Sequence, residues 1–167
     1  MTRFVVPRSL ILLAVLAVML TAPAWAGELR PFVRGSHAAL VKEYAGRPLV
    51  IHFWSLTCAP CLVELPQWRD VQRRHPEMDL VLVATDSPDE SAKLERTLAR
   101  AGLSGVESWV FADSFAERLR FEVDKSWRGE LPMTQLVGRD GKIEAVTGSV
   151  TAETLKTWLG GRGGVKP

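Results

Sequence analysis

The two cysteines of the chain, Cys58 and Cys61, stand where the hydrophobic pattern of the sequence changes abruptly. Before them, residues 49–54 form a near-continuous apolar run after the turn signal Gly46-Arg47-Pro48. Such a run predicts a strand that is buried on both faces of a sheet. After them, residues 58–74 predict a helix. A cysteine pair at a junction between a strand and a helix is the feature that most limits the possible folds.

The helix predicted over residues 58–74 is amphipathic. Its apolar positions recur at helical spacing, with polar residues between them. The apolar positions are Leu62, Leu65, Trp68 and Val71, and the intervening polar ones are Glu64, Arg69, Arg73 and Arg74. Pro66 lies inside the pattern and predicts a kink, and His75-Pro76 ends the helix.

The rest of the chain alternates between strand and helix patterns. Strands are expected at 80–84, 109–112, 133–137 and 143–147, the last two forming a hairpin around Asp140-Gly141. Helices are expected at 36–44, at 91–101 before Gly102, from a Ser114 cap to Phe121, and after a Thr151 cap. Residues 160–167 are expected to be a frayed tail. The order indicates an α/β fold with a mixed sheet.

The first 26 residues have the layout of a secretory signal peptide. Arg3 and Arg8 precede an apolar run at 10–20, and Ala24-Trp25-Ala26 offers small residues for cleavage. Cleavage there gives a domain of residues 27–167 and a periplasmic or other extracytoplasmic location. The alternative is an uncleaved segment that anchors the domain to the membrane.

Charge gives no indication of a nucleic-acid partner. The chain has 21 Lys and Arg against 19 Asp and Glu, and loss of Arg3 and Arg8 leaves 19 of each sign. A formally neutral domain offers no basic surface for a polyanion. We therefore expect no nucleic-acid partner.

The position of Cys58 predicts a reactive thiol. Unpaired amides and the dipole at a helix N-terminus stabilise a thiolate, which lowers the cysteine pKa. Pro60 suits the first helical turn, and Cys61 follows one turn later. Cys58 is therefore the expected attacking sulfur and Cys61 the resolving one.

Other uses of the cysteine pair fit the sequence less well. A bridge over so short a loop constrains the unfolded chain weakly, so a structural role is a poor explanation. Haem attachment needs a His where Leu62 stands, and the scattered His37, His52 and His75 lack zinc-ligand spacing. A copper site formed by both thiolates and one histidine remains an alternative. No bound metal or other cofactor is expected beyond the redox-active disulfide.

Several motifs in order resemble the thioredoxin superfamily, and within it the exported TlpA/ResA-like thiol–disulfide oxidoreductases. They are Phe53-Trp54-Ser55, Thr57-Cys58-Ala59-Pro60-Cys61, Glu64 with Pro66, Leu131-Pro132-Met133-Thr134, and Asp140-Gly141-Lys142. The resemblance covers roughly residues 30–160. It implies a thioredoxin-like fold, with a central mixed sheet flanked by helices on both faces.

The resemblance also implies roles for residues near the pair. It makes Leu131-Pro132 a cis peptide bond opposite the cysteines, where a substrate strand can hydrogen-bond, and it places Trp54 beside the site. His52 stands where thioredoxin has a buried Asp, so proton transfer by a near-neutral imidazole competes with a structural role. Asp86 is a second candidate for proton transfer, with an exposed turn residue as the alternative.

Thr57 and the segment 124–130 are two further features in which the sequence departs from the family pattern. Thr57 replaces the Trp that often precedes the first cysteine. Residues 124–130 lengthen the approach to Pro132, so that Trp127 and Arg128 could border the site, with a solvated loop as the alternative. Trp68, Trp109 and Trp158 lie within apolar patterns and are expected in the core.

The resemblance implies a monomeric thiol–disulfide oxidoreductase that acts on protein thiols and disulfides as a reductant. A membrane-bound electron donor and a role in cytochrome c or metal-centre maturation are implied with it. The sequence itself does not determine the direction, because CxxC pairs span potentials from about −270 to about −120 mV. The alternatives are a Cu(I) metallochaperone and a non-catalytic interaction module. A peroxidase is disfavoured, because it needs a different loop context around its cysteine.

Overall fold

The computed structural model describes residues 28–163 of the chain. The predicted signal peptide, residues 1–26, lies outside these residues, and so does the end of the predicted tail. Within the described part, no helix has the length and apolar character needed to cross a membrane.

Six strands form one mixed sheet in the order β1-β4-β3-β2-β5-β6. The strands are β1 (Arg30–Phe32), β2 (Leu49–Trp54), β3 (Asp79–Ala84), β4 (Glu107–Phe111), β5 (Met133–Val137) and β6 (Ile143–Thr147). The first four in chain order pair in parallel, whereas β5 is antiparallel to both β2 and β6. The predicted α/β fold with a mixed sheet is confirmed.

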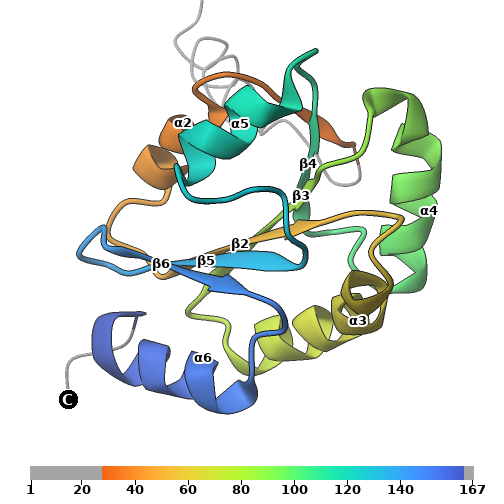
Figure 1. Cartoon of the computed structure of the whole chain (residues 1–167). Helices are drawn as coiled ribbons and strands as arrows, with labels where there is room; N and C mark the ends of the chain where they lie inside the picture. Colours follow the sequence, from red (N-terminus) through yellow and green to blue (C-terminus); the bar gives the residue numbers. More distant parts are fainter. Residues whose placement is uncertain (1–27, 164–167) are drawn as a thin grey trace, which may run out of the picture.

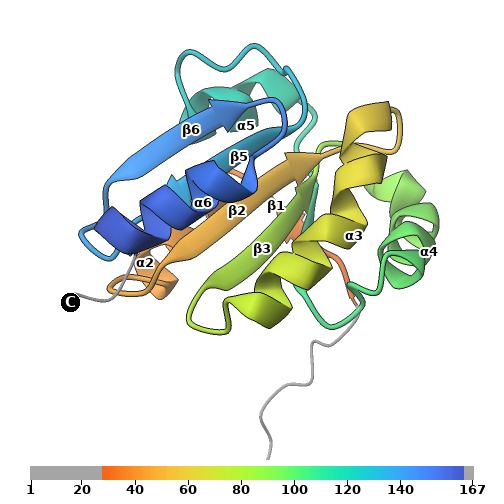
Figure 2. The ribbon, with the colours of Figure 1, turned by 90° about the horizontal axis from the view of Figure 1, so that it is seen from below.

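Helices cover both faces of the sheet, as the resemblance implied (Figures 1 and 2). They are α2 (Ser36–Glu43), α3 (Ala59–Arg74), α4 (Ser91–Arg100), α5 (Ala116–Val123) and α6 (Ala152–Trp158), with a short 3₁₀ turn, η2 (Pro88–Glu90), before α4. Helices α3, α4 and α6 contribute to one core cluster and α2 and α5 to the other. The sheet therefore separates two hydrophobic layers.

Strand β2 supplies both layers at once. Val50 and Trp54 belong to the cluster beneath α3, α4 and α6, whereas Leu49, Ile51 and Phe53 belong to the other. Because side chains alternate across a strand, a run buried on both faces is largely apolar, and His52 is the polar exception in β2. This confirms the interpretation of residues 49–54.

Some predicted boundaries were wrong. Strand β1 was not predicted, because three residues that include Pro31 give no readable alternation. Ser114 does not cap α5, since its N-cap is Phe115 and the nearby side-chain acceptor is Asp113, which binds the Phe115 N–H at 2.8 Å. The chain after α6 continues in a π-helical turn, η3 (Leu159–Gly163), where a tail was expected.

The buried face of α3 also differs from the prediction. Its buried residues are Cys61, Glu64, Leu65 and Trp68, whereas Leu62 is 39% exposed and Val63 is 69% exposed. The predicted face thus misplaced Leu62 and treated Glu64 as solvated. The helix continues through Pro66 to Arg74, which is the predicted end.

Candidate active site

Cys58 and Cys61 form a disulfide at the start of α3, with their sulfurs 1.99 Å apart. Cys58 is the N-cap residue and is half-buried, whereas Cys61 is fully buried. The Sγ of Cys58 accepts the backbone N–H of Cys61 at 3.2 Å. A sulfur that already accepts an amide at a helix N-terminus is placed to be stabilised as a thiolate after reduction.

The loop between β2 and α3 is held by Asp86, which follows β3. Its carboxylate accepts the Ser55 hydroxyl at 3.0 Å and the Leu56 N–H at 3.2 Å. The Ser55 oxygen also accepts the Thr57 N–H at 3.1 Å. Asp86 is therefore a half-buried support for the segment that leads to Cys58 and not an exposed turn residue.

The Leu131–Pro132 peptide bond is cis, as the resemblance implied. Pro132 directly precedes β5, whose first residue, Met133, pairs with Phe53 of β2. Pro132 therefore lies beside the end of β2 that leads to the cysteines. Its carbonyl accepts the Gly148 N–H at 2.8 Å.

His52 lies beneath the helix and is fully buried. Its Nδ1 is 3.0 Å from the Thr134 hydroxyl, its ring centroid is 5.1 Å from that of Trp68, and its Nε2 has no partner. Burial lowers the pKa of His52 to about 3. This shift favours the structural role of His52 over proton transfer by a near-neutral imidazole, because no charge near the ring offsets its loss of solvation.

Glu64 is a buried carboxyl that the sequence analysis did not select as a site residue. It lies one turn after Cys61 on α3 and is 4% exposed. Its Oε1 accepts the Val150 N–H at 3.0 Å, and its buried Oε2 has no partner. Burial raises the pKa of Glu64, an effect that the Val150 N–H partly opposes. The Glu64–Pro66 motif was the available signal, but helical spacing alone placed Glu64 on the polar face.

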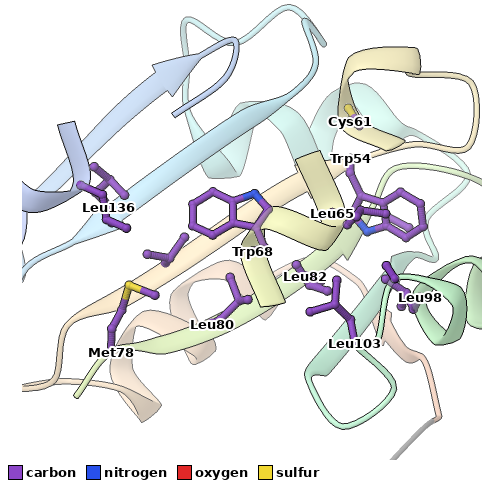
Figure 3. Packing of buried hydrophobic residues seen from close by; sticks show 14 of the residues in the cluster. Trp54, Cys61, Leu65, Trp68, Met78, Leu80, Leu82, Leu98, Leu103 and Leu136 are labelled. Atoms are coloured by element: carbon purple, nitrogen blue, oxygen red, sulfur yellow. The ribbon is translucent and has the colours of Figure 1, made fainter. Parts of the chain in front are cut away.

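The aromatic residues near the pair lie within the core. Trp54 is fully buried and shares a cluster with Cys61, as Figure 3 shows. Trp127 is 7% exposed, with its ring 5.0 Å from Phe53 and its indole N–H donated to the Glu130 carbonyl at 2.9 Å. The loop containing Trp127 is therefore attached to the core. Trp68, Trp109 and Trp158 are also buried, as predicted.

The other residues considered from the sequence are exposed or lie away from the disulfide. Pro60 occupies the first turn of α3 and is exposed, and Arg128 is exposed in the loop before β5. His37 lies apart, with Nε2 2.7 Å from Gln135 Oε1, and His75 contacts Glu77. Among residues 28–163, no group of three or more His, Cys, Asp or Glu side chains is placed to hold a metal ion.

Comparisons with known proteins agree with this geometry, although no protein-family model matches the chain. The sporulation thiol-disulfide oxidoreductase A of Bacillus subtilis is 28% identical over 123 residues, covering 68% of this chain and 67% of that protein. The thiol-disulfide oxidoreductase ResA of Bacillus thuringiensis is 22% identical over 127 residues, covering 71% and 65%. The matches thus span about two thirds of the length of these relatives.

A solved structure adds three-dimensional support. The crystal structure of StoA from Bacillus subtilis has a TM-score of 0.51 and 26% identity, covering 69% of this chain and 84% of that one. The fold, the disulfide at the start of α3 and the sequence matches agree with one another. The chain has a thioredoxin-like fold and is similar in sequence to thiol–disulfide oxidoreductases of the ResA and StoA type.

Proposed function

We propose that the chain reduces disulfides of protein substrates outside the cytoplasm through the Cys58–Cys61 pair. The observation that supports this most directly is the unequal exposure of the two sulfurs. Cys58 is half-buried at the helix N-terminus and Cys61 is fully buried. The Cys58 sulfur is accessible to a substrate, whereas the Cys61 sulfur is accessible only to Cys58.

The reaction transfers two electrons from the reduced pair to the substrate. The Cys58 thiolate attacks one substrate sulfur and forms a mixed disulfide, and the other substrate sulfur leaves as a thiolate that takes up a proton. The Cys61 thiolate then attacks the Cys58 Sγ, which expels the second substrate sulfur as a thiolate that also takes up a proton, and leaves the Cys58–Cys61 disulfide. This last state is the one in the structure.

Glu64 is the proposed acceptor of the Cys61 proton in the second step. Cys61 is buried, and burial disfavours its thiolate. A carboxyl one helical turn away, with one unpartnered buried oxygen, can take this proton. His52 is less suited, because a pKa of about 3 makes its imidazole too weak a base to take a proton from a thiol.

The direction, location and partners in this proposal rest on sequence features and on the family resemblance. The predicted signal peptide supports export, with residues 27–167 as the working domain, and a disulfide can persist there. The similarity to ResA-type proteins supports reduction of substrates during cytochrome c or metal-centre maturation, with a membrane-bound dithiol as electron donor. The protein acts as a monomer in this proposal, and its disulfide is its sole redox group.

The direction is tested by equilibrating the pair with reduced and oxidised glutathione and quantifying the two states. We expect a potential near the thioredoxin end of the range, about −270 mV. A value near −120 mV would show an oxidant and contradict the proposed reductase. The Cys61→Ser variant should trap substrates on Cys58. If only Cys58→Ser traps them, the roles of the two cysteines are reversed.

The copper alternative is tested with the same protein. Reduced protein is titrated with Cu(I) and, separately, assayed for reduction of insulin disulfides. Insulin reduction supports the oxidoreductase. Tight one-to-one Cu(I) binding without insulin reduction would contradict it.

A further inference from the structure

A groove of about 410 Å³ lies between α3 and α4, the two helices that Figure 2 shows side by side at one end of the sheet. Its apolar lining includes Leu56, Leu62 and Pro66. Leu62 is 39% exposed, although a leucine at a helical apolar position is usually buried. The groove is thus an open apolar surface and not a closed part of the core.

The groove borders the start of α3, where the disulfide lies. Leu56 stands two residues before Cys58, and Leu62 lies one helical turn after Cys58, whose carbonyl accepts the Leu62 N–H at 3.1 Å. A substrate joined to Cys58 Sγ in the mixed disulfide continues past this sulfur at about 3.3 Å per extended residue. Because one helical turn, the separation of Cys58 and Leu62, spans about 5.4 Å, two or three extended residues beside the reacting cysteine are long enough to reach the groove.

The α4 side of the groove is positively charged. Lys93 and Arg100, one turn of α4 on either side of Thr97, line it, and no acidic residue does. Lys93 has an exposed partner, Glu90, at 3.3 Å. Arg100 donates only to the Arg96 carbonyl and the Thr97 hydroxyl, and no carboxylate among residues 28–163 forms an ion pair with it. The groove therefore combines an apolar floor with a cation that lacks an acidic partner.

We propose that this groove binds the substrate polypeptide beside the reacting cysteine and selects segments that contain an apolar side chain next to a carboxylate. The apolar side chain packs on Leu62 and Leu56, and the carboxylate faces Arg100 and Lys93. Opposite charges of this kind raise association rates and favour one partner over another. The inference rests on the proposed reductase function and adds to it the chemistry of the preferred substrate.

The test uses three synthetic peptides that each contain one internal disulfide and differ only beside the first cysteine. Their variable segments are Leu-Asp-Asp, Leu-Lys-Lys and Ser-Asp-Asp. Reduced protein is mixed with each peptide at low ionic strength, and the second-order rate constant of disulfide reduction is measured. We expect Leu-Asp-Asp to react roughly tenfold faster than Leu-Lys-Lys, and faster than Ser-Asp-Asp.

Charge reversal in the groove identifies the residues responsible. The double variant Lys93→Glu/Arg100→Glu should invert the preference between Leu-Asp-Asp and Leu-Lys-Lys. Arg96→Glu is the matched control, because Arg96 is exposed on the same helix but lines a different pocket. It should keep the wild-type preference. Leu62→Ser should remove the advantage of Leu-Asp-Asp over Ser-Asp-Asp.

Reduction of hydroxyethyl disulfide, which is too small to reach the groove, separates the two proposals. If each variant reduces this compound and the peptide preferences change as stated, the groove is supported. Equal rates for all peptides, or an equal change with Arg96→Glu, would overturn the groove while leaving the reductase intact. If the wild-type protein reduces neither peptides nor hydroxyethyl disulfide, both proposals fail.

Discussion

Two buried ionisable side chains, Glu64 and His52, lie on the α3 side of the sheet and respond oppositely to burial. The carboxyl of Glu64 gains a higher pKa and the imidazole of His52 a lower one, since burial disfavours the charged form of each. Glu64 therefore changes charge at a higher pH than an exposed carboxyl. His52 remains neutral well below its ordinary pKa.

Replacement of Glu64 should slow the resolving step. In Glu64→Gln the side chain keeps its size but cannot accept the Cys61 proton, and loss of such a base typically costs about 10²-fold or more. We expect attack by Cys58 to be unchanged and decay of the mixed disulfide to slow, with loss of the rise in rate as pH increases through the raised Glu64 pKa. Rapid mixing with a fluorescent peptide disulfide separates the two steps.

The Glu64 prediction has a matched control. Glu77→Gln changes a carboxylate that is exposed beside His75, after the end of α3. It should leave both steps unchanged. Equal decay of the mixed disulfide in wild type and Glu64→Gln would show that Cys61 loses its proton by another route.

His52 should make the fold sensitive to acid. The pKa of His52 is about 3 in the folded protein and 6.5 in the unfolded chain. Below pH 6.5 only the unfolded chain takes up the proton, so the unfolding free energy is highest above pH 6.5 and decreases as pH falls toward 3. This gives a loss of about 2 kcal/mol in unfolding free energy between pH 7.5 and pH 5. His52→Leu should remove that part of the pH dependence in urea titrations, whatever its effect at pH 7.5. An unchanged slope would mean that His52 can be protonated in the folded state.

At the scale of elements, hydrophobic patterns predicted the positions of the strands well. They predicted less well which residues of each helix are buried. Residues 49–54, 133–137 and 143–147 match β2, β5 and β6, because apolar runs and the Asp140-Gly141 turn are local signals. The exposure of Leu62 and burial of Glu64 depend on where α4 and α6 pack against α3. No pattern within one helix contains that information.

The loop between β2 and α3 gives a second prediction at this scale. Asp86→Ala removes the acceptor for Ser55 and for the Leu56 N–H, and bonds to a charged acceptor contribute about 1.5–3 kcal/mol when buried. Because Asp86 is only half-buried, we expect a loss of about 1–2 kcal/mol in unfolding free energy. Faster hydrogen exchange at Leu56 and Thr57, with slower attack by Cys58, should accompany it.

Asp86→Asn keeps one acceptor oxygen. Its unfolding free energy and its hydrogen-exchange rates at Leu56 and Thr57 should lie between those of wild type and Asp86→Ala. Identical exchange in all three proteins would show that the loop is held without this carboxylate. The link between Asp86 and Ser55 joins residues 31 positions apart. Such a contact cannot be read from sequence spacing, which explains why an exposed turn remained an alternative for Asp86.

For the whole molecule, the order of motifs predicted the architecture because each local signal agreed with one chain path. Strand β2 at the centre of the sheet, α3 after it and the β5–β6 hairpin beside it place the disulfide and Pro132 at the same end. The short edge strand β1 was missed, since its pairing with β4 is long-range. The groove between α3 and α4 was missed for the same reason, because it exists only once two helices have packed.

The redox state should change the stability of the whole domain. Closing the loop from Cys58 to Cys61 costs the unfolded chain about 2 kcal/mol, whereas the folded chain already holds the two cysteines together. Stabilisation of the Cys58 thiolate at the start of α3 opposes this by favouring the reduced fold. In a reductant, the stabilisation of the oxidised fold by loop closure must exceed the stabilisation of the reduced fold by the Cys58 thiolate. A CxxC protein whose reduced form is the more stable one is a strong oxidant.

We therefore expect the oxidised protein to have an unfolding free energy about 1–2 kcal/mol higher than that of the reduced protein. Urea titrations with and without dithiothreitol measure the difference, which corresponds to about 30 mV of potential for each 1.4 kcal/mol. The Cys58→Ser/Cys61→Ser double variant should show no effect of dithiothreitol. A reduced form more stable than the oxidised one would mean that the Cys58 thiolate is stabilised by more than loop closure costs, and electrons would then flow from substrates to this protein.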